Sequence, residues 1–324
     1  MTVLVTGAAG FIGFHACSKL LERRETVVGI DNLNDYYDPA LKLARLEQLK
    51  QHSSFRFEKL DFSDHEAVLA LINEVKPERI LHLGAQAGVR YSIENPYTYA
   101  QSNLIGHLSI LEAARSLGDD LKHLVYASSS SVYGERSNVP FREEDAANSP
   151  ASLYAATKRS DEMMSASYSS LYGIPASGMR FFTVYGPWGR PDMAYWSFAE
   201  AMLEGKPIRV FNEGKMERDF TYIDDVIEPL LRVLDDDPKR GRHEVYNIGG
   251  SSPEKLMDMI AALEVAFNST VEKIMVPMQA GDVTCTYADA SKIRAEYGYE
   301  PKVRLDEGLK RFADWFLKWR VRSD

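Results

Sequence analysis

Two side chains that can move a proton stand four positions apart in the segment Tyr-Ala-Ala-Thr-Lys, namely Tyr154 and Lys158. Residues at i and i+4 share one face of a helix, so the phenol and the ammonium can address the same ligand. A nearby positive charge favours the phenolate, which can then take a proton from a substrate hydroxyl. Standing alone, this spacing is common and fits a solvated helix face as well.

A run of four serines at 128–131 ends a segment that we expect to be a strand. A plain serine-rich turn explains such a run when no other catalytic motif is present. Together with Tyr154 and Lys158, one serine is better explained as a partner in proton transfer.

A glycine-rich turn, TGAAGFIG (6–13), follows the first predicted strand and opens the first predicted helix. Gly7, Gly10 and Gly13 permit a tight turn and a close approach of the backbone to a diphosphate, which the free N–H groups of the helix N-terminus can bind. Asp31 stands 21 positions after Gly10, where a carboxylate accepts both ribose hydroxyls of NAD and repels the 2′-phosphate of NADP. NAD is therefore the expected cofactor.

The predicted cofactor contacts lie in the turns that follow the first four strands. The pair Asp61-Phe62 fits an adenine contact and equally a simple turn, and the small residues at 83–86 fit either a passage for the cofactor or ordinary strand-end packing. The contacts predicted from these turns are Gly7, Gly10, Phe11, Ile12, Gly13, Asp31, Asn32, Asp61, Phe62, Leu83, Ala85 and Gln86, with Tyr154 and Lys158 beside the nicotinamide.

Short apolar runs alternate with helical patterns and must position these groups. Strands are predicted at 2–6, 27–31, 55–60, 79–83, 121–128 and 176–182, and helices at about 11–24, 39–50, 64–75, 98–117 and 152–172. Strands separated by helices imply crossover connections and a parallel sheet that is covered on both faces. The predicted class is α/β.

The pattern changes after residue 186, where Gly-Pro-Trp-Gly-Arg-Pro (186–191) is typical of a loop and later elements are shorter. We expect a nucleotide-binding domain at 1–186 plus 222–248. A smaller α+β substrate lobe is expected at 187–221 plus 249–324.

Composition restricts the classes of partner. The chain has 324 residues and a net charge of -9, so it repels nucleic-acid backbones. Cys17 and Cys285 are the only cysteines, which favours free thiols in a reducing compartment, and no long apolar stretch suggests a membrane span. A cytoplasmic protein without a metal site is expected. The apolar faces of helices 98–117 and 152–172 fit a homodimer contact or the core.

The sequence resembles the extended short-chain dehydrogenase/reductase family, specifically its nucleotide-sugar epimerases, and within them the UDP-glucuronate 4-epimerase branch. The residues that carry the resemblance span nearly the whole chain: TGAAGFIG (6–13), IDNLNDYYDPALK (30–42), HLGAQAGVRYS (82–92), YASSSSVYG (126–134), YAATK (154–158), RFFTVYGPWGRPDMA (180–194), GKMERDFTYIDD (214–225), YNIGGSSP (246–253) and QAGDVTCTYAD (279–289). The resemblance implies a Rossmann-like doubly wound parallel sheet, retained NAD and a UDP-sugar substrate.

The resemblance also implies roles for single residues. Tyr154 would take the proton of the sugar 4-hydroxyl, and Ser129 matches the family's catalytic Ser/Thr. Asn103 and Phe182 match cofactor-side positions, and Arg218 matches a diphosphate-binding arginine. A 4-keto sugar would form, turn and be reduced on its other face.

Two features distinguish possible substrates. Dehydratases of the family carry Asp-Glu, and uronate decarboxylases carry Glu, where this chain has Ser130 and Ser131; removing a 6-hydroxyl needs an added acid and base. Arg190 can grip a substrate carboxylate through two parallel hydrogen bonds, although a salt bridge with Asp192 or an exposed loop charge also explains it.

Further substrate contacts are expected from Thr183, Ser130 and Ser131. Arg90 is a second candidate for the carboxylate, with a structural role equally open. Many UDP-galactose epimerases have Arg where Gln279 stands, so in that segment only Asp282 is carried over, with a loop-capping role as the alternative.

The leading function is NAD-dependent 4-epimerisation of UDP-glucuronate to UDP-galacturonate. The alternatives are a 4-epimerase for UDP-galactose or a UDP-pentose, then a UDP-glucuronate decarboxylase. A catalytically silent NAD-binding scaffold is the non-enzyme alternative, and such proteins commonly lose the tyrosine or the lysine that stand here at 154 and 158.

Overall fold

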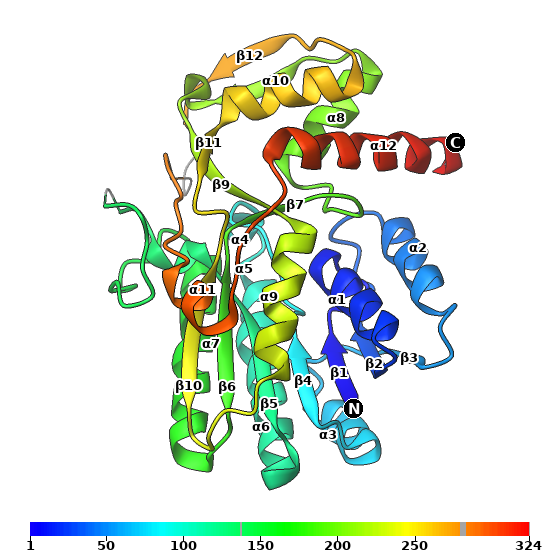
Figure 1. The fold of residues 1–324 in the computed structure, drawn as a ribbon, viewed down its shortest axis with the longest axis vertical. Helices are drawn as coiled ribbons and strands as arrows, with labels where there is room; N and C mark the ends of the chain where they lie inside the picture. Colours follow the sequence, from blue (N-terminus) through cyan, green and yellow to red (C-terminus); the bar gives the residue numbers. More distant parts are fainter. Residues whose placement is uncertain (137, 279–282, 324) are drawn as a thin grey trace. The chain divides into compact units, whose positions relative to one another are not determined.

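The computed structural model of the chain describes residues 1–136, 138–278 and 283–323 (Figure 1). The chain divides into two units, each built from three segments. The first unit comprises 1–134, 145–181 and 227–246, and the second comprises 135–144, 182–226 and 247–324.

The first unit is built on a seven-stranded sheet in the order β10-β6-β5-β4-β1-β2-β3. The pairings of β1 with β2 and β4, of β2 with β3, of β4 with β5 and of β5 with β6 are parallel. The strand order turns away from β1 in both directions, which is the doubly wound topology. The strands are β1 (Thr2–Thr6), β2 (Thr26–Asp31), β3 (Phe55–Lys59), β4 (Arg79–His82), β5 (His123–Ser129), β6 (Ala176–Phe181) and β10 (His243–Ile248). The predicted fold class is confirmed.

The central strands of this sheet are buried because helices pack on its faces. Side chains of α3, α6 and the sheet form one apolar core against which Met164 and Tyr168 of α7 pack. The ends of α1 and α9 are joined by an ion pair of Arg23 with Asp235 at 2.7 Å. The helices are α1 (Phe11–Glu22), α2 (Pro39–Leu49), α3 (His65–Val75), α4 (Tyr91–Glu94), α5 (Pro96–Tyr99), α6 (Gly106–Leu117), α7 (Leu153–Tyr172) and α9 (Ile223–Asp235), the last of which begins in the second unit.

The predicted helix at 98–117 is helical throughout, but part of it has the wider turns of a π-helix. It consists of α5, a π-helical stretch at Ala100–Ile105 and α6. Gly106 lies where the ring of Phe62 packs, since a Cβ there would be 2.4 Å from that ring. Wider turns of this kind are frequent at functional sites, and this one carries Asn103.

The second unit contains a three-stranded sheet in the order β11-β9-β7 and a parallel pair, β12 with β8. Tyr195 and Trp196 of α8 pack on Phe312 and Phe316 of α12, with ring centroids 4.9 Å apart for Tyr195 and Phe312. Its elements are β7 (Thr183–Tyr185), α8 (Ala194–Glu204), β8 (Ile208–Phe211), β9 (Glu217–Tyr222), β11 (Pro253–Lys255), α10 (Leu256–Phe267), β12 (Lys273–Val276), α11 (Ser291–Tyr297) and α12 (Leu305–Ser323).

The unit boundaries differ from those derived from the sequence. Residues 135–144, 182–186, 222–226 and 247–248 belong to the second unit, whereas the sequence-derived domains included them in the first. Phe141 explains the first of these differences because it bridges to Ala288, a partner too far along the chain for a local pattern to indicate.

Candidate active site

The glycine turn between β1 and α1 leaves no room for side chains. Gly7 has a left-handed backbone with φ of 67°, and Gly10 N–H donates to the Gly7 carbonyl at 2.8 Å. A Cβ at Gly13 would lie 2.1 Å from the Gly7 oxygen. Gly10, the N-cap of α1, has no side chain to cap the first-turn N–H groups, so the helix N-terminus that begins with Phe11 and Ile12 is suited to bind an anion.

A hydrogen-bonded chain ties this turn to the end of β4. Gly84 N–H donates to Thr6 Oγ1 at 2.9 Å, and Thr6 Oγ1 lies 2.7 Å from His82 Nδ1. Thr6 Oγ1 and His82 Nδ1 therefore form a buried hydrogen bond. Burial, with a smaller contribution from the Lys158 charge, lowers the pKa of His82 to about 3, so the ring stays neutral.

Asp31 lies at the end of β2, where the sequence placed it. Its Oδ1 accepts the N–H of Leu33 at 2.8 Å, and its Oδ2 accepts the N–H of Ala9 at 3.2 Å. The carboxylate therefore joins the glycine turn to the loop after β2.

The two candidate adenine contacts have different surroundings. Asp61 accepts a hydrogen bond from Asn32 Nδ2 at 2.9 Å and also caps Ser63; the Asn32 bond lowers the pKa of Asp61 against the opposing effect of burial. Phe62 is buried, and its ring packs on His82 with centroids 5.2 Å apart. The phenyl ring of Phe62 thus belongs to the core.

The loop after β4 is held by the π-helical stretch. Asn103 accepts from Gln86 N–H at 2.8 Å and donates from Nδ2 to the Gln86 carbonyl and to Thr157 Oγ1. Asn103 therefore connects the loop that contains Leu83, Ala85 and Gln86 with helix α7.

Tyr154 and Lys158 lie in the first two turns of α7, whose N-terminus is capped by Ser152. Lys158 Nζ donates to the Ala127 carbonyl of β5 and to Asp161 Oδ2, both at 3.0 Å. The ring of Tyr154 is half-buried and packs edge-on against Tyr99. The structure thus fixes the ammonium at the carboxyl end of β5.

The serine run marks that same end of β5. Ser129 Oγ accepts the N–H of Ser131 at 3.1 Å, so Ser129 caps the short 3₁₀ turn of Ser130–Tyr133. Ser130 and Ser131 are partly exposed. Ser128 instead points inward and donates to Glu162 at 2.6 Å.

Four of the described candidates belong to the second unit, namely Phe182, Thr183, Arg190 and Arg218. Phe182 is buried against Phe141, and Thr183 begins β7. Arg218 of β9 donates to the carbonyls of Glu217 and Thr284. Asp282 lies outside the described residues.

Arg190 forms an ion pair with Asp192, which the sequence analysis gave as an alternative to binding a substrate carboxylate. Its Nε donates to Asp192 Oδ1 at 2.9 Å, and its Nη2 also pairs with the Asp192 carboxylate. About a quarter of each side chain is exposed. The ion pair shows that the Arg190 fork can engage a carboxylate with two nitrogens.

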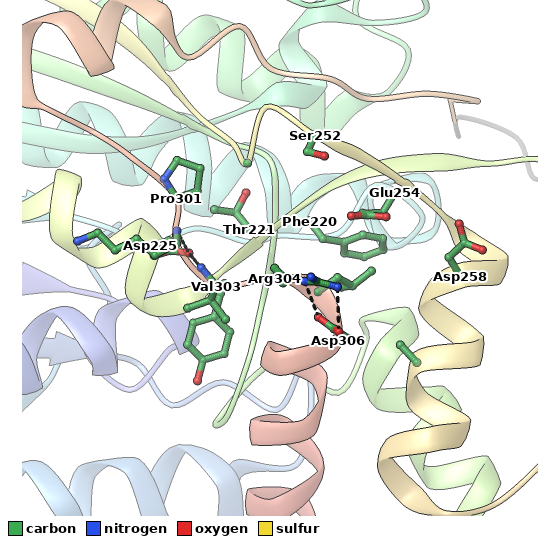
Figure 2. Close-up of a pocket in the computed structure, with 15 residues that line it drawn as sticks. Phe220, Thr221, Asp225, Ser252, Glu254, Asp258, Pro301, Val303, Arg304 and Asp306 are labelled. Atoms are coloured by element: carbon green, nitrogen blue, oxygen red, sulfur yellow. Dashed lines mark hydrogen bonds and ion pairs between the residues drawn. The ribbon is translucent and has the colours of Figure 1, made fainter.

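Arg90 is exposed and is the N-cap residue of α4. A cavity of about 420 Å³ in the second unit is lined by β9, the start of α9, α10 and residues 301–306, and none of the predicted site residues lines it. Figure 2 shows Asp225 accepting backbone N–H groups of this segment and Arg304 paired with Asp306.

Comparison with known proteins identifies the family. Residues 4–312 match the family model described as GDP-mannose 4,6 dehydratase. An uncharacterized protein of Methanocaldococcus jannaschii is 51% identical over 99% of this chain and 98% of its own length. A probable UDP-glucuronate 4-epimerase of Rhizobium meliloti is 42% identical over 98% of this chain and 97% of its own.

A solved structure agrees with these relatives. The UDP-glucuronic acid 4-epimerase from Bacillus cereus, in complex with UDP-glucuronic acid and NAD, matches with a TM-score of 0.91 and 36% identity over 98% of this chain and 100% of that chain. The chain belongs to the nucleotide-sugar epimerases of the extended short-chain dehydrogenase/reductase family.

Membership of the epimerase family confirms the resemblance drawn from the motifs.

Within the described parts of the chain, no helix is long and apolar enough to cross a membrane, and no cluster of three or more His, Cys, Asp or Glu side chains is placed to hold a metal.

Sequence reasoning did not select Asp161 or Glu162, although both belong to the polar groups around Lys158 in this epimerase. Asp161 contacts the ammonium, and Glu162 joins Ser128 to Arg180. A detectable signal existed for Asp161, because an acid three positions after a helical lysine lies on the same side of the helix.

Proposed function

We propose that this protein is an NAD-dependent UDP-glucuronate 4-epimerase, which forms UDP-galacturonate through a transient 4-keto sugar. The observation that carries the proposal is the placement of Tyr154 and Lys158 on α7, with the ammonium held at the end of β5 beside the serine run. The similarity to epimerases that are named for this reaction supports the choice of substrate.

The residues of the first unit fit NAD. The glycine turn has a backbone on which a Cβ at Gly13 would clash, and Asp31 stands at the end of the neighbouring strand. In this proposal Gly7, Gly10 and Gly13 face the diphosphate and Asp31 binds the adenosine ribose. Bound NAD supplies the hydride chemistry at carbon 4 of the sugar.

The catalytic side chains each have one task. Tyr154 takes the proton from the sugar 4-hydroxyl and returns a proton to the 4-keto oxygen after the sugar has turned. Lys158 stabilises the phenolate by its charge, and Ser129 donates a hydrogen bond to the sugar oxygen. Because the proton that Tyr154 takes is later given back, Tyr154 is regenerated in each turnover.

Arg190, Thr183, Ser130 and Ser131 account for a uronate substrate. Arg190 would exchange Asp192 for the substrate carboxylate, which needs the same two-nitrogen geometry. Neutral serines at 130 and 131 do not repel a carboxylate, and they supply no acid for dehydration. Arg218 would bind the diphosphate, with Arg90 and Asp282 as further candidate contacts.

One observation favours a second candidate function. Arg190 is already paired with Asp192 in this structure, so the loop can be electrostatically complete without a uronate. A 4-epimerase for a neutral UDP-sugar, such as UDP-galactose or a UDP-pentose, is the enzyme compatible with that interpretation.

We also propose a cytoplasmic homodimer. Exposed apolar side chains occur on α6 and α7, where Leu108 is 37% and Met163 is 61% exposed. Both cysteines are free thiols, as expected in a reducing compartment. A solution molar mass near twice 36.5 kDa would support the dimer, and a value near 36.5 kDa would rule it out.

Product analysis tests the proposed function. Purified protein incubated with UDP-glucuronate should give UDP-galacturonate in NMR spectra, whereas Tyr154→Phe should lower kcat by about 10²- to 10⁴-fold because the general base is lost. Circular dichroism should show an unchanged fold for the variant. Conversion of UDP-galactose with no turnover of UDP-glucuronate would select the second candidate.

A further inference from the structure

Asp161 of α7 is a buried carboxylate beside the Lys158 ammonium. Its side chain is 1% exposed, and one of its oxygens, Oδ1, is buried without a hydrogen-bond partner. Burying a carboxylate with an unsatisfied oxygen destabilises the folded state and so lowers the free energy of unfolding. The only described hydrogen bond to the carboxylate comes from Lys158 Nζ, at 3.0 Å.

We propose that Asp161 is a positioning residue that keeps the Lys158 ammonium charged and aims it at its ligand. An ammonium has three donors. The Ala127 carbonyl and Asp161 each accept one, and their two directions leave one N–H for Tyr154 or the cofactor. The inference rests on the proposed function, since it assigns Lys158 the task of favouring the Tyr154 phenolate.

The neighbouring titratable groups do not replace Asp161 as the counterion. Glu162 already pairs with Arg180 at 2.8 Å and with Arg159 at 2.7 Å. Burial lowers the pKa of His82 on β4 and of His107 on α6, so these rings are neutral at pH 7.

Another titratable group near Asp161 is the Tyr126 phenol of β5. Burial raises its pKa well above its ordinary value, so it too is uncharged at pH 7. Burial also raises the pKa of Asp161, and the Lys158 charge offsets only part of that effect. The Lys158 charge thus favours the ionised form of the Asp161 carboxyl.

The Asp161→Asn variant separates the hydrogen bond from the negative charge. The amide oxygen still accepts a hydrogen bond from Lys158, but the side chain is neutral. A buried ammonium without a counterion tends to lose its proton. We expect the acid limb of the pH profile of kcat to move to higher pH by about one unit, since an uncharged lysine no longer favours the phenolate. Asp161→Glu, which restores the charge, should return the limb toward its original position.

A readout without substrate separates this inference from the proposed function. Phenolate absorbance, taken as the difference between a protein and its Tyr154→Phe counterpart, should appear at higher pH in Asp161→Asn than in the parent. NAD retained on purification, measured after denaturation, should fall if the third N–H serves the cofactor. Failure of the parent to epimerise any UDP-sugar would refute the function but leave the absorbance test intact.

A variant at a different buried carboxylate tests whether the effect is specific to Asp161. Asp225→Asn removes another buried carboxylate, one that accepts the N–H groups of Lys302 and Val303, and should move neither the limb nor the absorbance. If Asp161→Asn does not fold, Asp161→Ser provides a second neutral variant. The proposal would be overturned if kcat fell equally at every pH while the acid limb and the phenolate absorbance stayed at their original pH. A shift of either transition to lower pH would also overturn it.

Discussion

In the proposed reaction, Arg190 is the side chain that we expect to determine which product forms. A 4-keto uronate is a β-keto acid, which loses carbon dioxide when the bond to its carboxylate aligns with the ketone π system. In our account Arg190 holds the carboxylate out of that alignment with the two-nitrogen grip that it applies to Asp192 in this structure.

The Arg190→Ala variant tests this role. We expect the variant to release carbon dioxide and a UDP-pentose from UDP-glucuronate, with UDP-galacturonate formation reduced at least about tenfold because a charge-assisted grip is lost. Labelled carbon dioxide and NMR of the products measure the partition. Arg190→Lys, which keeps the charge without the fork, should be intermediate; a variant that makes UDP-galacturonate at the normal rate, free of carbon dioxide, would refute the role.

At the scale of single residues, the sequence predicted the element on which a candidate residue lies better than it predicted what surrounds the side chain. Gly13, Asp31, Tyr154 and Lys158 lie on the elements expected from their motifs. The core position of the Phe62 ring was not predictable, because it depends on Gly84 and Gly106, whose missing Cβ atoms make room for it. No local pattern indicates which distant glycine will lie against a ring.

The β1–α1 element depends on backbone approach more than on side chains. A Cβ at Gly13 would lie 2.1 Å from the Gly7 oxygen, whereas one at Gly10 would lie 3.0 Å from the same atom. A small outward movement of the turn relieves the second contact but not the first.

The two alanine variants should therefore differ. Gly13→Ala is expected to destabilise the protein by about 2–4 kcal/mol, in the range of overpacked or strained sites, and to lose retained NAD. Gly10→Ala is expected to lose no more than about 1 kcal/mol and to keep more NAD. Urea unfolding and NAD content after purification measure both effects, and equal losses in the two variants would contradict the steric explanation.

At the scale of elements, the alternation of strands and helices was enough to predict the parallel sheet. The π-helical stretch within the predicted helix 98–117 was not predictable, because the apolar periodicity of the segment is nearly that of one α-helix. In the folded chain this stretch carries Asn103, which hydrogen-bonds both Gln86 and Thr157.

At the scale of the whole molecule, the first unit buries several neutral histidines. Burial lowers the pKa of His123 to about 4, with a further contribution from the Arg79 charge, and its Nε2 lies 2.9 Å from Ser177 Oγ. In the unfolded chain a histidine titrates near 6.5. A group whose folded pKa is depressed contributes stability above its unfolded pKa, and that contribution is lost as the pH falls toward the folded value.

The His123→Gln variant separates the pH-dependent stability contribution of His123 from the contributions of other titratable groups. Asp161 and Asp219, whose pKa values burial raises to about 7 and about 6, act oppositely, gaining stability as the pH falls. Both carboxyls are shared by the parent and the variant, so their effect cancels in the comparison. The stability advantage of the parent should shrink by roughly 3 kcal/mol between pH 7 and pH 4. Urea unfolding at several pH values measures it, and a difference that does not vary with pH would contradict the assignment.

The domain boundaries show the limit of sequence reasoning at this scale. The segment 135–144 belongs to the second unit through pairing of Phe141 with Ala288 and a hydrogen bond from Asn247 N–H to Glu143. These partners are more than 100 positions away, and only the folded chain brings them together.

The most direct test of the central claim is NMR of the protein with UDP-glucuronate in deuterium oxide, without added NAD. We expect UDP-galacturonate with protium retained at carbon 4 and no carbon dioxide, because the hydrogen removed from carbon 4 stays within the site and is returned to the opposite face. Deuterium at carbon 4, or a decarboxylated pentose as the main product, would contradict it.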